Sequence, residues 1–418
     1  MTIMACLVSQ QHVPNLLAIQ AVKPDRLVLL VTPGMKKREK DAHLLKALAA
    51  GGRDYSAEHE IVDVVDENSI ATVSRALEQS LEKHPDDEWI VNLTGGTKPM
   101  SIGAYVFSRD RKLKTLYIAE SDQHHAIDLL GGAPTDLDHQ VSTAEFLAGY
   151  GFDLLNSHTL EKNENSARKW VDIAAMLTAN HDDGSLREML GRLHSLQEKK
   201  VKTSRKAWER EGLTLSDRDG ISLRDSSLRA AIAGEFNLEE SGARLTGHLD
   251  KHAAEFLTGK WLEVFVWSLL LPFEDRGIWD LHLGVNAGRK GSGESNDFDV
   301  SFMQDQSLCI VECKTGGQDH DPGANTTLYK IEAVKAGLMA IRMKTYLATT
   351  SPNVVKQGTG RIKESVANRC KLYNCTIVHG EPLREMAKLF LNEDPSLHER
   401  VAATFHLNQQ GSVGGERL

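Results

Sequence analysis

Acidic residues and one lysine lie close together in two short segments of the chain. Residues 296–300 read Asn-Asp-Phe-Asp-Val, and residues 310–315 read Ile-Val-Glu-Cys-Lys-Thr. Both segments are typical of strands, and Gln304–Ser307 between them is a plausible hairpin turn. The pattern predicts two adjacent strands that bring charged side chains to the edge of an apolar sheet.

The charged side chains of the two strands are expected to converge. Alternate side chains of a strand share a face, so we expect Asp297 and Asp299 on one face of the first strand, opposite its apolar residues. Glu312 and Lys314 share a face of the second strand. Carboxylate oxygens suit Mg²⁺ or Mn²⁺, and a nearby lysine suits a phosphate oxygen or an attacking water. These residue types predict a metal-dependent phosphodiesterase, with a solvated charged face as the alternative.

Each residue of this group can be given a role in phosphodiester hydrolysis. Asp299 and Glu312 are predicted to bind the divalent metal, and the backbone carbonyl of Cys313 completes the protein ligands. Lys314 is predicted to orient the attacking water and to stabilise the negative charge that develops. Asp297 is a candidate for holding a second metal or a bound water.

Glu263 is a further acidic candidate because it lies within the apolar segment Gly259–Trp267. A carboxylate among such neighbours is costly unless it is paired or bound to metal. Glu263 could therefore share the role proposed for Asp297, or instead form a salt bridge with Lys260 or lie on an exposed helix face. Lys330, on a later predicted helix, either faces the substrate phosphate or is a surface lysine.

A glycine-rich turn near residue 95 is a second kind of candidate site. Residues 92–100 read Asn-Leu-Thr-Gly-Gly-Thr-Lys-Pro-Met and join a predicted strand to a predicted helix. The N–H groups at the helix start, with Lys98 and the threonine hydroxyls, would hold an anion. The loop fits neither a Walker A motif nor a GxGxxG fingerprint. A tight connection whose glycines serve geometry alone is the alternative.

Two more polar loops, residues 9–15 and 32–35, also follow predicted strands. The carboxyl ends of parallel strands share one rim of a sheet, so the three loops together outline one pocket for a polar, phosphate-bearing ligand. His12 in the first of these loops is more readily a loop or ligand histidine than a catalyst. The residues predicted to bind the ligand are Ser9, Gln10, Gln11, Thr32, Thr94, Gly95, Gly96, Thr97, Lys98 and Met100.

The elements that must position these residues follow two patterns. Residues 1–150 alternate strand and helix up to about residue 130, with strands predicted at 3–9, 26–32, 59–65, 88–92 and 115–120 and helices at 15–23, 36–50, 68–83 and 99–109. This alternation predicts a parallel, doubly wound sheet with Rossmann-like topology.

The later part of the chain changes pattern twice. Residues 151–250, with helices at 166–177 and 185–200, are predicted to form a helical connector or insert. Residues 251–405 begin with a long apolar helix at 252–271 and continue as β-β-β-α-β-α-β, an α/β sandwich whose helix after the third strand is predicted at 328–343. Residues 406–418 are predicted to be a flexible tail.

Composition narrows the possible partners. The 418 residues, 41% of them hydrophobic, suggest two or three domains, and the net charge of −9 argues against a broad basic surface for duplex DNA. Five cysteines without the spacing of a zinc site favour reduced thiols in a cytoplasm. The sequence has no run of eighteen uncharged apolar residues, so no membrane span is predicted. Two local basic patches are candidates for contact with nucleic acid, although the first could equally be a solvated helix end or linker. They are Lys199, Lys200, Lys202, Arg205 and Lys206, and separately Arg289 with Lys290.

The motif residues resemble two known families. Asp299 with Glu312-Cys313-Lys314, and Glu263 on the preceding helix, resemble the PD-(D/E)XK nuclease superfamily, although Phe298 stands where that motif has its proline. Residues 92–100, with the stretches 7–9 and 14–17, resemble a CARF domain, the sensor of CRISPR-linked cyclic oligoadenylates. The two in this order resemble the CARF–PD-(D/E)XK effectors of type III CRISPR antiviral systems.

The resemblance implies a mechanism and a set of partners. It implies a Rossmann-like sensor domain and a restriction-endonuclease-like α/β domain, in a homodimer whose two sensors embrace one cyclic tetra-adenylate. Ligand binding would activate the nuclease allosterically. The activated enzyme would use Mn²⁺ or Mg²⁺ to cleave single-stranded RNA or DNA, or supercoiled duplex DNA, in the cytoplasm. The alternative is a regulator whose C-terminal half binds nucleic acid or a partner without cleavage. The intact set of Asp299, Glu312 and Lys314 favours the nuclease.

Overall fold

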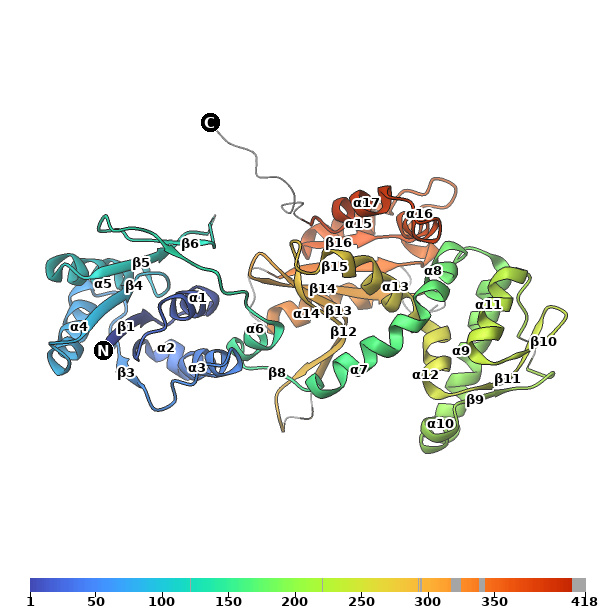
Figure 1. Cartoon of the computed structure of the whole chain (residues 1–418), viewed down its shortest axis with the longest axis horizontal. Helices are drawn as coiled ribbons and strands as arrows, with labels where there is room; N and C mark the ends of the chain where they lie inside the picture. Colours follow the sequence, from blue (N-terminus) through green and yellow to red (C-terminus); the bar gives the residue numbers. More distant parts are fainter. Residues whose placement is uncertain are drawn as a thin grey trace.

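The computed structural model of the chain describes residues 1–120, 122–219, 221–291, 293, 295–316, 325–337 and 343–407. A seven-stranded sheet lies at one end of the elongated molecule, a six-stranded sheet in the middle, and a three-stranded sheet at the other end (Figure 1). The first and second sheets carry the two groups of residues that the sequence singles out.

The first sheet has the strand order β3-β2-β1-β4-β5-β6-β7. Its strands are β1 (Thr2–Leu7), β2 (Arg26–Val31), β3 (His59–Asp63), β4 (Glu88–Asn92), β5 (Lys114–Ile118), β6 (His125–Ile127) and β7 (Thr135–Asp136). The first five strands in this order pair in parallel, which confirms the predicted Rossmann-like topology. Strands β6 and β7 pair antiparallel at one edge and were not predicted.

Both faces of the first sheet are covered, as a doubly wound fold requires. In β1, Met4 and Cys6 face one apolar cluster while Ile3 and Ala5 face another, which explains the continuous apolar run. The helices that cover these faces are α1 (Val13–Val22), α3 (Lys40–Ala50) and α6 (Thr143–Gly149) on the first, and α4 (Ile70–Lys83) and α5 (Lys98–Arg111) on the second.

The helix predicted at 36–50 is two helices in the structure. A short helix, α2 (Pro33–Lys37), precedes α3. Glu39, which caps α3, has a left-handed φ of 55° that interrupts a continuous helix.

The second sheet has the strand order β16-β15-β14-β13-β12-β8. Its strands are β8 (Asp153–Leu154), β12 (Trp279–Gly288), β13 (Ser295–Gln304), β14 (Ser307–Lys314), β15 (Lys344–Thr349) and β16 (Cys375–Val378). With α14 (Asn325–Gly337) and α15 (Glu364–Leu372) between the last strands, the element order matches the predicted β-β-β-α-β-α-β. Residues 338–342 of the helix predicted at 328–343, and 408–418 of the predicted tail, lie outside the described residues.

The apolar segment predicted as one helix at 252–271 is kinked. It comprises α12 (Lys251–Glu255), a π-helical turn (Phe256–Lys260) and α13 (Trp261–Leu270), with non-helical backbone at Gly259. By length and composition Lys251–Phe273 could cross a membrane, but 67% of its apolar 18-residue stretch is buried inside the protein. The segment is the core helix of the second domain, followed along the chain by α16 (Gly380–Leu391) and α17 (Ser396–Thr404).

Residues 151–250 are more than the helical connector that the sequence predicts. They contain α7 (Ser157–Ala167), α8 (Val171–Ala179), α9 (Gly184–Thr203), α10 (Arg205–Glu211) and α11 (Ser226–Phe236), and the strands β9 (Leu213–Leu215), β10 (Glu239–Ser241) and β11 (Arg244–Leu249). The strands form the small antiparallel sheet. Trp208 and Leu245 share one apolar cluster with Trp267 of α13, so this region packs onto the second domain.

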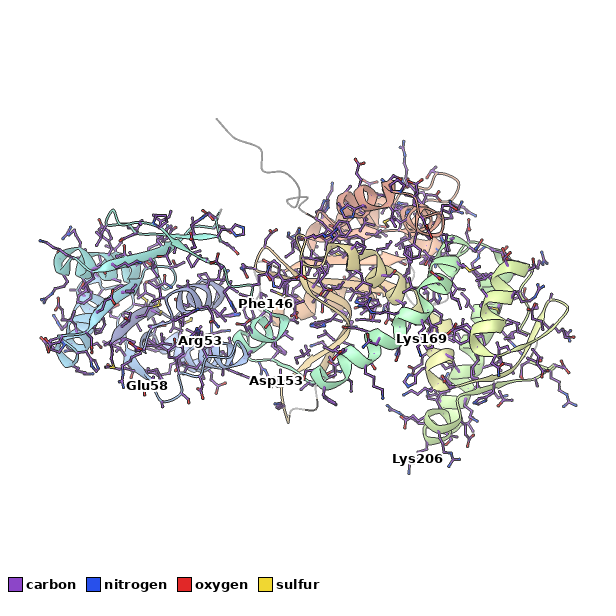
Figure 2. All side chains as sticks on the ribbon, viewed as in Figure 1. Arg53, Glu58, Phe146, Asp153, Lys169 and Lys206 are labelled. Atoms are coloured by element: carbon purple, nitrogen blue, oxygen red, sulfur yellow. The ribbon has the colours of Figure 1, made fainter. Side chains whose placement is uncertain are left out.

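Helix α6 joins the first domain to the second. Phe146 on α6 lies between the two sheets (Figure 2), in one apolar cluster with Val285, Met303 and Leu308 of the second sheet. Immediately after α6, β8 adds an edge strand to the second sheet by pairing with Ala287 and Gly288 of β12. The two domains therefore share a packed junction.

Candidate functional site

The two motif strands form the predicted hairpin, and its register brings Asp299 opposite Glu312. The strands pair from Gln304↔Ser307 to Val300↔Val311, and the paired ladder ends one step before the two acids. There the Oδ2 atom of Asp299 accepts a hydrogen bond from the Cys313 backbone N–H at 2.7 Å. Beyond the last paired residues, the Asp299 carboxylate thus replaces a backbone carbonyl of β13 as the hydrogen-bond acceptor for β14.

Two lysines converge on the carboxylate of Glu312. The Nζ atom of Lys314 lies 2.9 Å from Oε1 of Glu312 and 4.0 Å from Oδ2 of Asp299. The Nζ atom of Lys330, on α14, lies 3.2 Å from the same Glu312 oxygen. Both acids are therefore within reach of one ammonium, and Glu312 is only 3% exposed. Lys330 joins this group, which the sequence left open.

Burial and mutual repulsion shift the titration of the acidic side chains. Burial, with the carboxylate of Glu312, raises the pKa of Asp299 to about 6. Burial, with the carboxylate of Asp299, raises the pKa of Glu263 on α13 to about 8. Burial opposes the charge on Lys314, but the carboxylates of Glu312 and Asp299 outweigh it and raise the lysine's pKa. Glu263, Asp299 and Glu312 thus act on one another.

The salt bridge considered for Glu263 is wrong. The Nζ atom of Lys260 instead binds Oε2 of Glu255 at 2.9 Å. Among the described residues, no positively charged group lies within 4.0 Å of the Glu263 carboxylate, so no ion pair compensates for its burial.

Among the described residues, the ion pairs that join Asp299, Glu312 and Lys314 do not include Asp297. It is exposed, and its Oδ1 accepts a hydrogen bond from Nδ2 of Asn286 on β12 at 2.6 Å. Phe298 packs in the cluster of Val285, whereas Val300 packs in the cluster of α13. The pairing of β12 with β13 keeps one register from Ser295 to Ser301, so these two side chains enter different clusters without a β-bulge.

The acidic group has the chemistry of a site for a hard cation. A buried and a half-buried carboxylate that repel each other would be stabilised by a divalent ion. Mg²⁺ is commonly held by one or two carboxylates plus water. In the described residues, no three side chains of His, Cys, Asp or Glu are placed to hold one ion. The thiol of Cys313 is buried in the core, and burial raises its pKa, so only its backbone could contribute a ligand.

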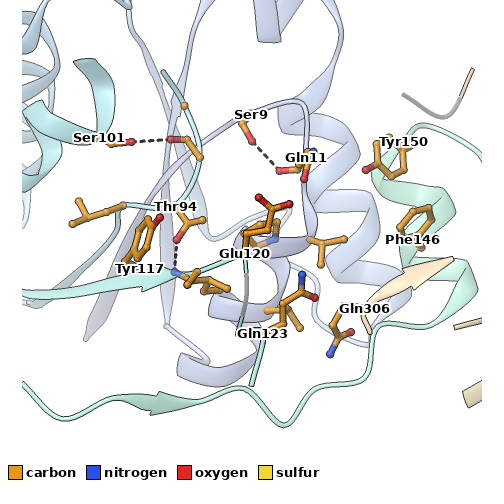
Figure 3. A pocket seen from close by; sticks show the side chains of 18 residues that line it. Ser9, Gln11, Thr94, Ser101, Tyr117, Glu120, Gln123, Phe146, Tyr150 and Gln306 are labelled. Carbon is orange, nitrogen blue, oxygen red and sulfur yellow. Dashed lines mark hydrogen bonds between the residues drawn. The ribbon is translucent and has the colours of Figure 1, made fainter. Parts of the chain in front are cut away.

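The three polar loops of the first domain meet at the carboxyl ends of their strands, as expected. They surround two cavities of about 340 and 310 Å³ that share Ser9, Gln11 and Gly96. Figure 3 shows the larger cavity. Of the predicted ligand residues, the larger cavity also has Thr94 and Gly95 in its wall, and the smaller has Gln10, Thr32, Thr97 and Met100. Lys98 is exposed and lies outside the walls of both cavities.

Hydrogen bonds fix the shape of the glycine turn. Nδ2 of Asn92 donates to Oδ1 of Asn15 at 2.8 Å, and Oδ1 of Asn92 accepts from the Thr94 N–H at 3.0 Å. The hydroxyl of Thr94 accepts from the Ile118 N–H at 2.8 Å, and that of Thr97 donates to the Glu67 carbonyl at 2.7 Å. The threonine hydroxyls thus hold the loop in place.

Gly95 must be glycine for two reasons. Its φ is 112°, and a Cβ there would stand 2.6 Å from the carbonyl oxygen of Leu7. The close approach to β1 keeps the N–H groups of the turn at the cavity.

Sequence reasoning missed several residues of the cavity wall. Phe146 and Tyr150, four residues apart on and just after α6, have the spacing of one helix face and could have been singled out. Gln306, in the turn of the motif hairpin, had no local signal. The remaining polar or aromatic wall residues are Ser101, Tyr117, Glu120 and Gln123.

His12 is not a catalyst in this structure. It is buried, with ring centroids 5.8 Å from Phe146 and 4.6 Å from Tyr150, and burial lowers its pKa to about 3. A neutral, enclosed imidazole packs the base of α6 against the first domain.

The lysine-rich patch at 199–206 is largely neutralised by nearby acids. Lys200 binds Glu211 and Lys202 binds Glu198, each at 3.1 Å. Lys206 of this patch lies at the end of the molecule far from the first sheet (Figure 2). These contacts favour the solvated-surface interpretation.

Comparison with known proteins assigns both domains. The family model of the Card1 CARF domain matches residues 3–146, and that of the Card1-like endonuclease domain matches residues 250–373. No curated protein matches the chain.

Two solved structures share the fold over nearly the whole chain. Can2 from Sulfobacillus thermosulfidooxidans, in complex with cyclic tetra-adenylate, is 22% identical with a TM-score of 0.69, and the match covers 97% of this chain and 99% of that one. Protein VC1899 from Vibrio cholerae is 18% identical with a TM-score of 0.72, covering 95% and 98%. With matched domains over more than half of its length, the chain belongs to the CARF nucleases, with a CARF domain and an endonuclease domain of the Card1 type.

Proposed function

We propose that this protein is a cyclic oligoadenylate-activated, metal-dependent endonuclease of type III CRISPR defence that cleaves RNA, DNA or both. The observation that carries the proposal is the group formed by buried Glu312 with half-buried Asp299 and Lys314, which lies in the domain that matches the Card1-like endonuclease. The CARF domain on the same chain supplies a cavity rimmed by strand-end loops. Cyclic tetra-adenylate is the proposed activator because the similar Can2 structure is a complex with that molecule.

In the nuclease centre, Asp299 and Glu312 would hold Mn²⁺ or Mg²⁺, with the Cys313 carbonyl as the third protein ligand. A bound divalent ion would lower the pKa of water and neutralise charge on the scissile phosphate. Lys314, charged and anchored 2.9 Å from Glu312, orients the attacking water and stabilises the developing negative charge. Lys330 contributes a second ammonium for the substrate phosphate from α14. Glu263, with its raised pKa, exchanges a proton with water near neutral pH.

The CARF cavity has groups for each part of an adenylate. The N–H groups at Gly95 and Gly96, in the turn that leads into α5, favour phosphate oxygens. The carboxamides of Gln11 and Gln123 suit the edges of a base, and the rings of Tyr117 and Phe146 can stack on it. A symmetric ring of four adenylates suits a homodimer that presents two copies of this cavity about one axis. We place such a dimer in the cytoplasm, with single strands or supercoiled DNA as substrate.

Glu312→Gln tests the proposal because it keeps the shape of the side chain and removes the charge. We expect cleavage of labelled single strands and of a supercoiled plasmid in Mn²⁺ to fall at least about 100-fold. Binding of cyclic tetra-adenylate, measured by calorimetry, should stay within about threefold of wild type. EDTA should abolish cleavage by the wild type.

The matched control is Glu274→Gln, a carboxylate of the same domain outside the acidic group. It should cleave as the wild type does. Full cleavage by Glu312→Gln would show that the hydrolytic centre is elsewhere, and cleavage unaffected by the activator would refute the regulatory half of the proposal. The alternative of a regulator that only binds nucleic acid is disfavoured by the endonuclease match.

A further inference from the structure

One wall of the CARF cavity comes from the nuclease domain. Gln306 lies in the two-residue turn of the β13–β14 hairpin, and its side chain lines the same cavity as Gln123 and Phe146 (Figure 3). The hairpin that carries the catalytic acids thus reaches the cavity directly.

Gln306 is bonded to the segment that leads from the CARF sheet into α6. Its Nε2 donates to the carbonyl of His139 at 2.7 Å, and its Oε1 accepts from the Val141 N–H at 3.0 Å. The residue is only 7% exposed. The carboxamide therefore pairs with the backbone of residues 139–141 as a neighbouring strand would, and it links the two domains.

Strand β12 holds the same segment from the other side. The indole N–H of Trp279 donates to the Val141 carbonyl at 2.8 Å, and the Thr143 N–H donates to Oδ2 of Asp280 at 2.5 Å. Residues 139–143 are thus clamped by three side chains of the nuclease domain. Because α6 begins at Thr143 and carries Phe146 of the cavity wall, a ligand that moves α6 must move the clamped segment.

The hairpin has little slack with which to absorb such a movement. Its turn has two residues, Asp305 and Gln306, both with left-handed φ near 50°, as in the tightest hairpins. Nε2 of Gln304 donates to the His406 carbonyl at 3.0 Å, which ties the base of the turn to the end of the domain.

The paired strands lead straight to the catalytic centre. The ladder is continuous from Gln304↔Ser307 to Val300↔Val311, and Asp299 and Glu312 follow at its end. Glu312 lies six positions after Gln306, roughly 20 Å along a strand. A shift at the turn therefore reaches both acids through one hydrogen-bonded element.

We infer that the β13–β14 hairpin transmits occupancy of the CARF cavity to the catalytic acids, and that Gln306 is the positioning residue that holds it to the cavity wall. The inference rests on the proposed activation by a cyclic oligoadenylate. It predicts that loss of Gln306 separates binding of the activator from its effect on cleavage.

The test compares Gln306→Ala with wild-type full-length protein in titrations with cyclic tetra-adenylate. We expect the activator's Kd to change less than about threefold, while the cleavage rate at saturating activator falls by about tenfold, within the usual range of allosteric coupling. Trp279→Phe, which removes the N–H to Val141 and keeps a ring, should lower the saturated rate in the same direction. Because it leaves the turn intact, it also serves if Gln306→Ala does not fold.

Gln11→Ala is the matched control, since Gln11 lines the same cavity from the CARF domain alone. It should raise the activator concentration needed for half-maximal cleavage by more than Gln306→Ala does. If extra activator restores the full rate of Gln306→Ala, Gln306 is a binding residue alone and the inference is wrong. If no cyclic oligoadenylate stimulates the wild type, the proposed function fails instead.

Discussion

Glu263 shows, at the scale of a residue, a group that destabilises the fold in which it sits. A carboxyl whose pKa is raised to about 8 in the folded protein resists ionisation there, whereas in the unfolded chain it ionises near 4.5. The folded state therefore loses stability as pH rises from about 4.5 through about 8. Proteins retain such groups chiefly where function requires them.

Replacing this carboxyl should accordingly stabilise the protein. In EDTA, we expect Glu263→Gln to raise Tm by a few degrees at pH 8 and to leave Tm nearly unchanged at pH 5. Cleavage in Mn²⁺ should fall at the same time. Thermal unfolding at the two pH values checks the first expectation, and a lower Tm at pH 8 would mean that Glu263 is stabilised by contacts of its own.

At the scale of an element, the glycine turn after β4 depends on one close approach. Gly95→Ala places a Cβ 2.6 Å from the Leu7 carbonyl in a left-handed conformation, so β1 and the turn must separate. We expect activator binding to weaken at least tenfold, measured by calorimetry. Gly52→Ala is the matched control, because Gly52 has a φ of 81° and open space around it. Equal effects of the two variants would mean that only the backbone conformation matters.

Elements that follow a regular period were predictable from sequence. The alternation of strand and helix gives the first sheet, and a two-residue turn between apolar runs fixes the register that sets Asp299 opposite Glu312. Strands of two or three residues, such as β7 and β9, have no period to detect.

Residues whose place depends on tertiary contacts were not predictable. Gln306 lines the CARF cavity through bonds to a segment about 165 residues away, and nothing in its own neighbourhood signals this. Asp297 is exposed and bonds to Asn286 of β12, a contact that strand alternation alone does not predict.

At the scale of the whole molecule, three regions meet at one half-buried histidine. His282 on β12 lies 3.1 Å from Glu164 of α7 and 3.1 Å from Asp280, and the other oxygen of Asp280 holds the Thr143 N–H of α6. Burial opposes the charge on His282, but the two carboxylates outweigh it and raise its pKa to about 9. A charged imidazolium therefore links the connector, the nuclease sheet and the CARF junction.

This link should make the assembled protein weaker in alkali. Because the pKa of His282 in the folded protein lies above its ordinary value near 6.5, its contribution to stability is complete below about pH 6.5 and is lost as pH rises through about 9. We expect Tm to fall more steeply between pH 6.5 and 9 in the wild type than in His282→Gln, whose side chain cannot titrate. Since Asp280 also fixes the start of α6, stimulation of cleavage by the activator should decline over the same interval in the wild type alone. Parallel Tm curves for the two proteins would show that the imidazolium does not hold these regions together.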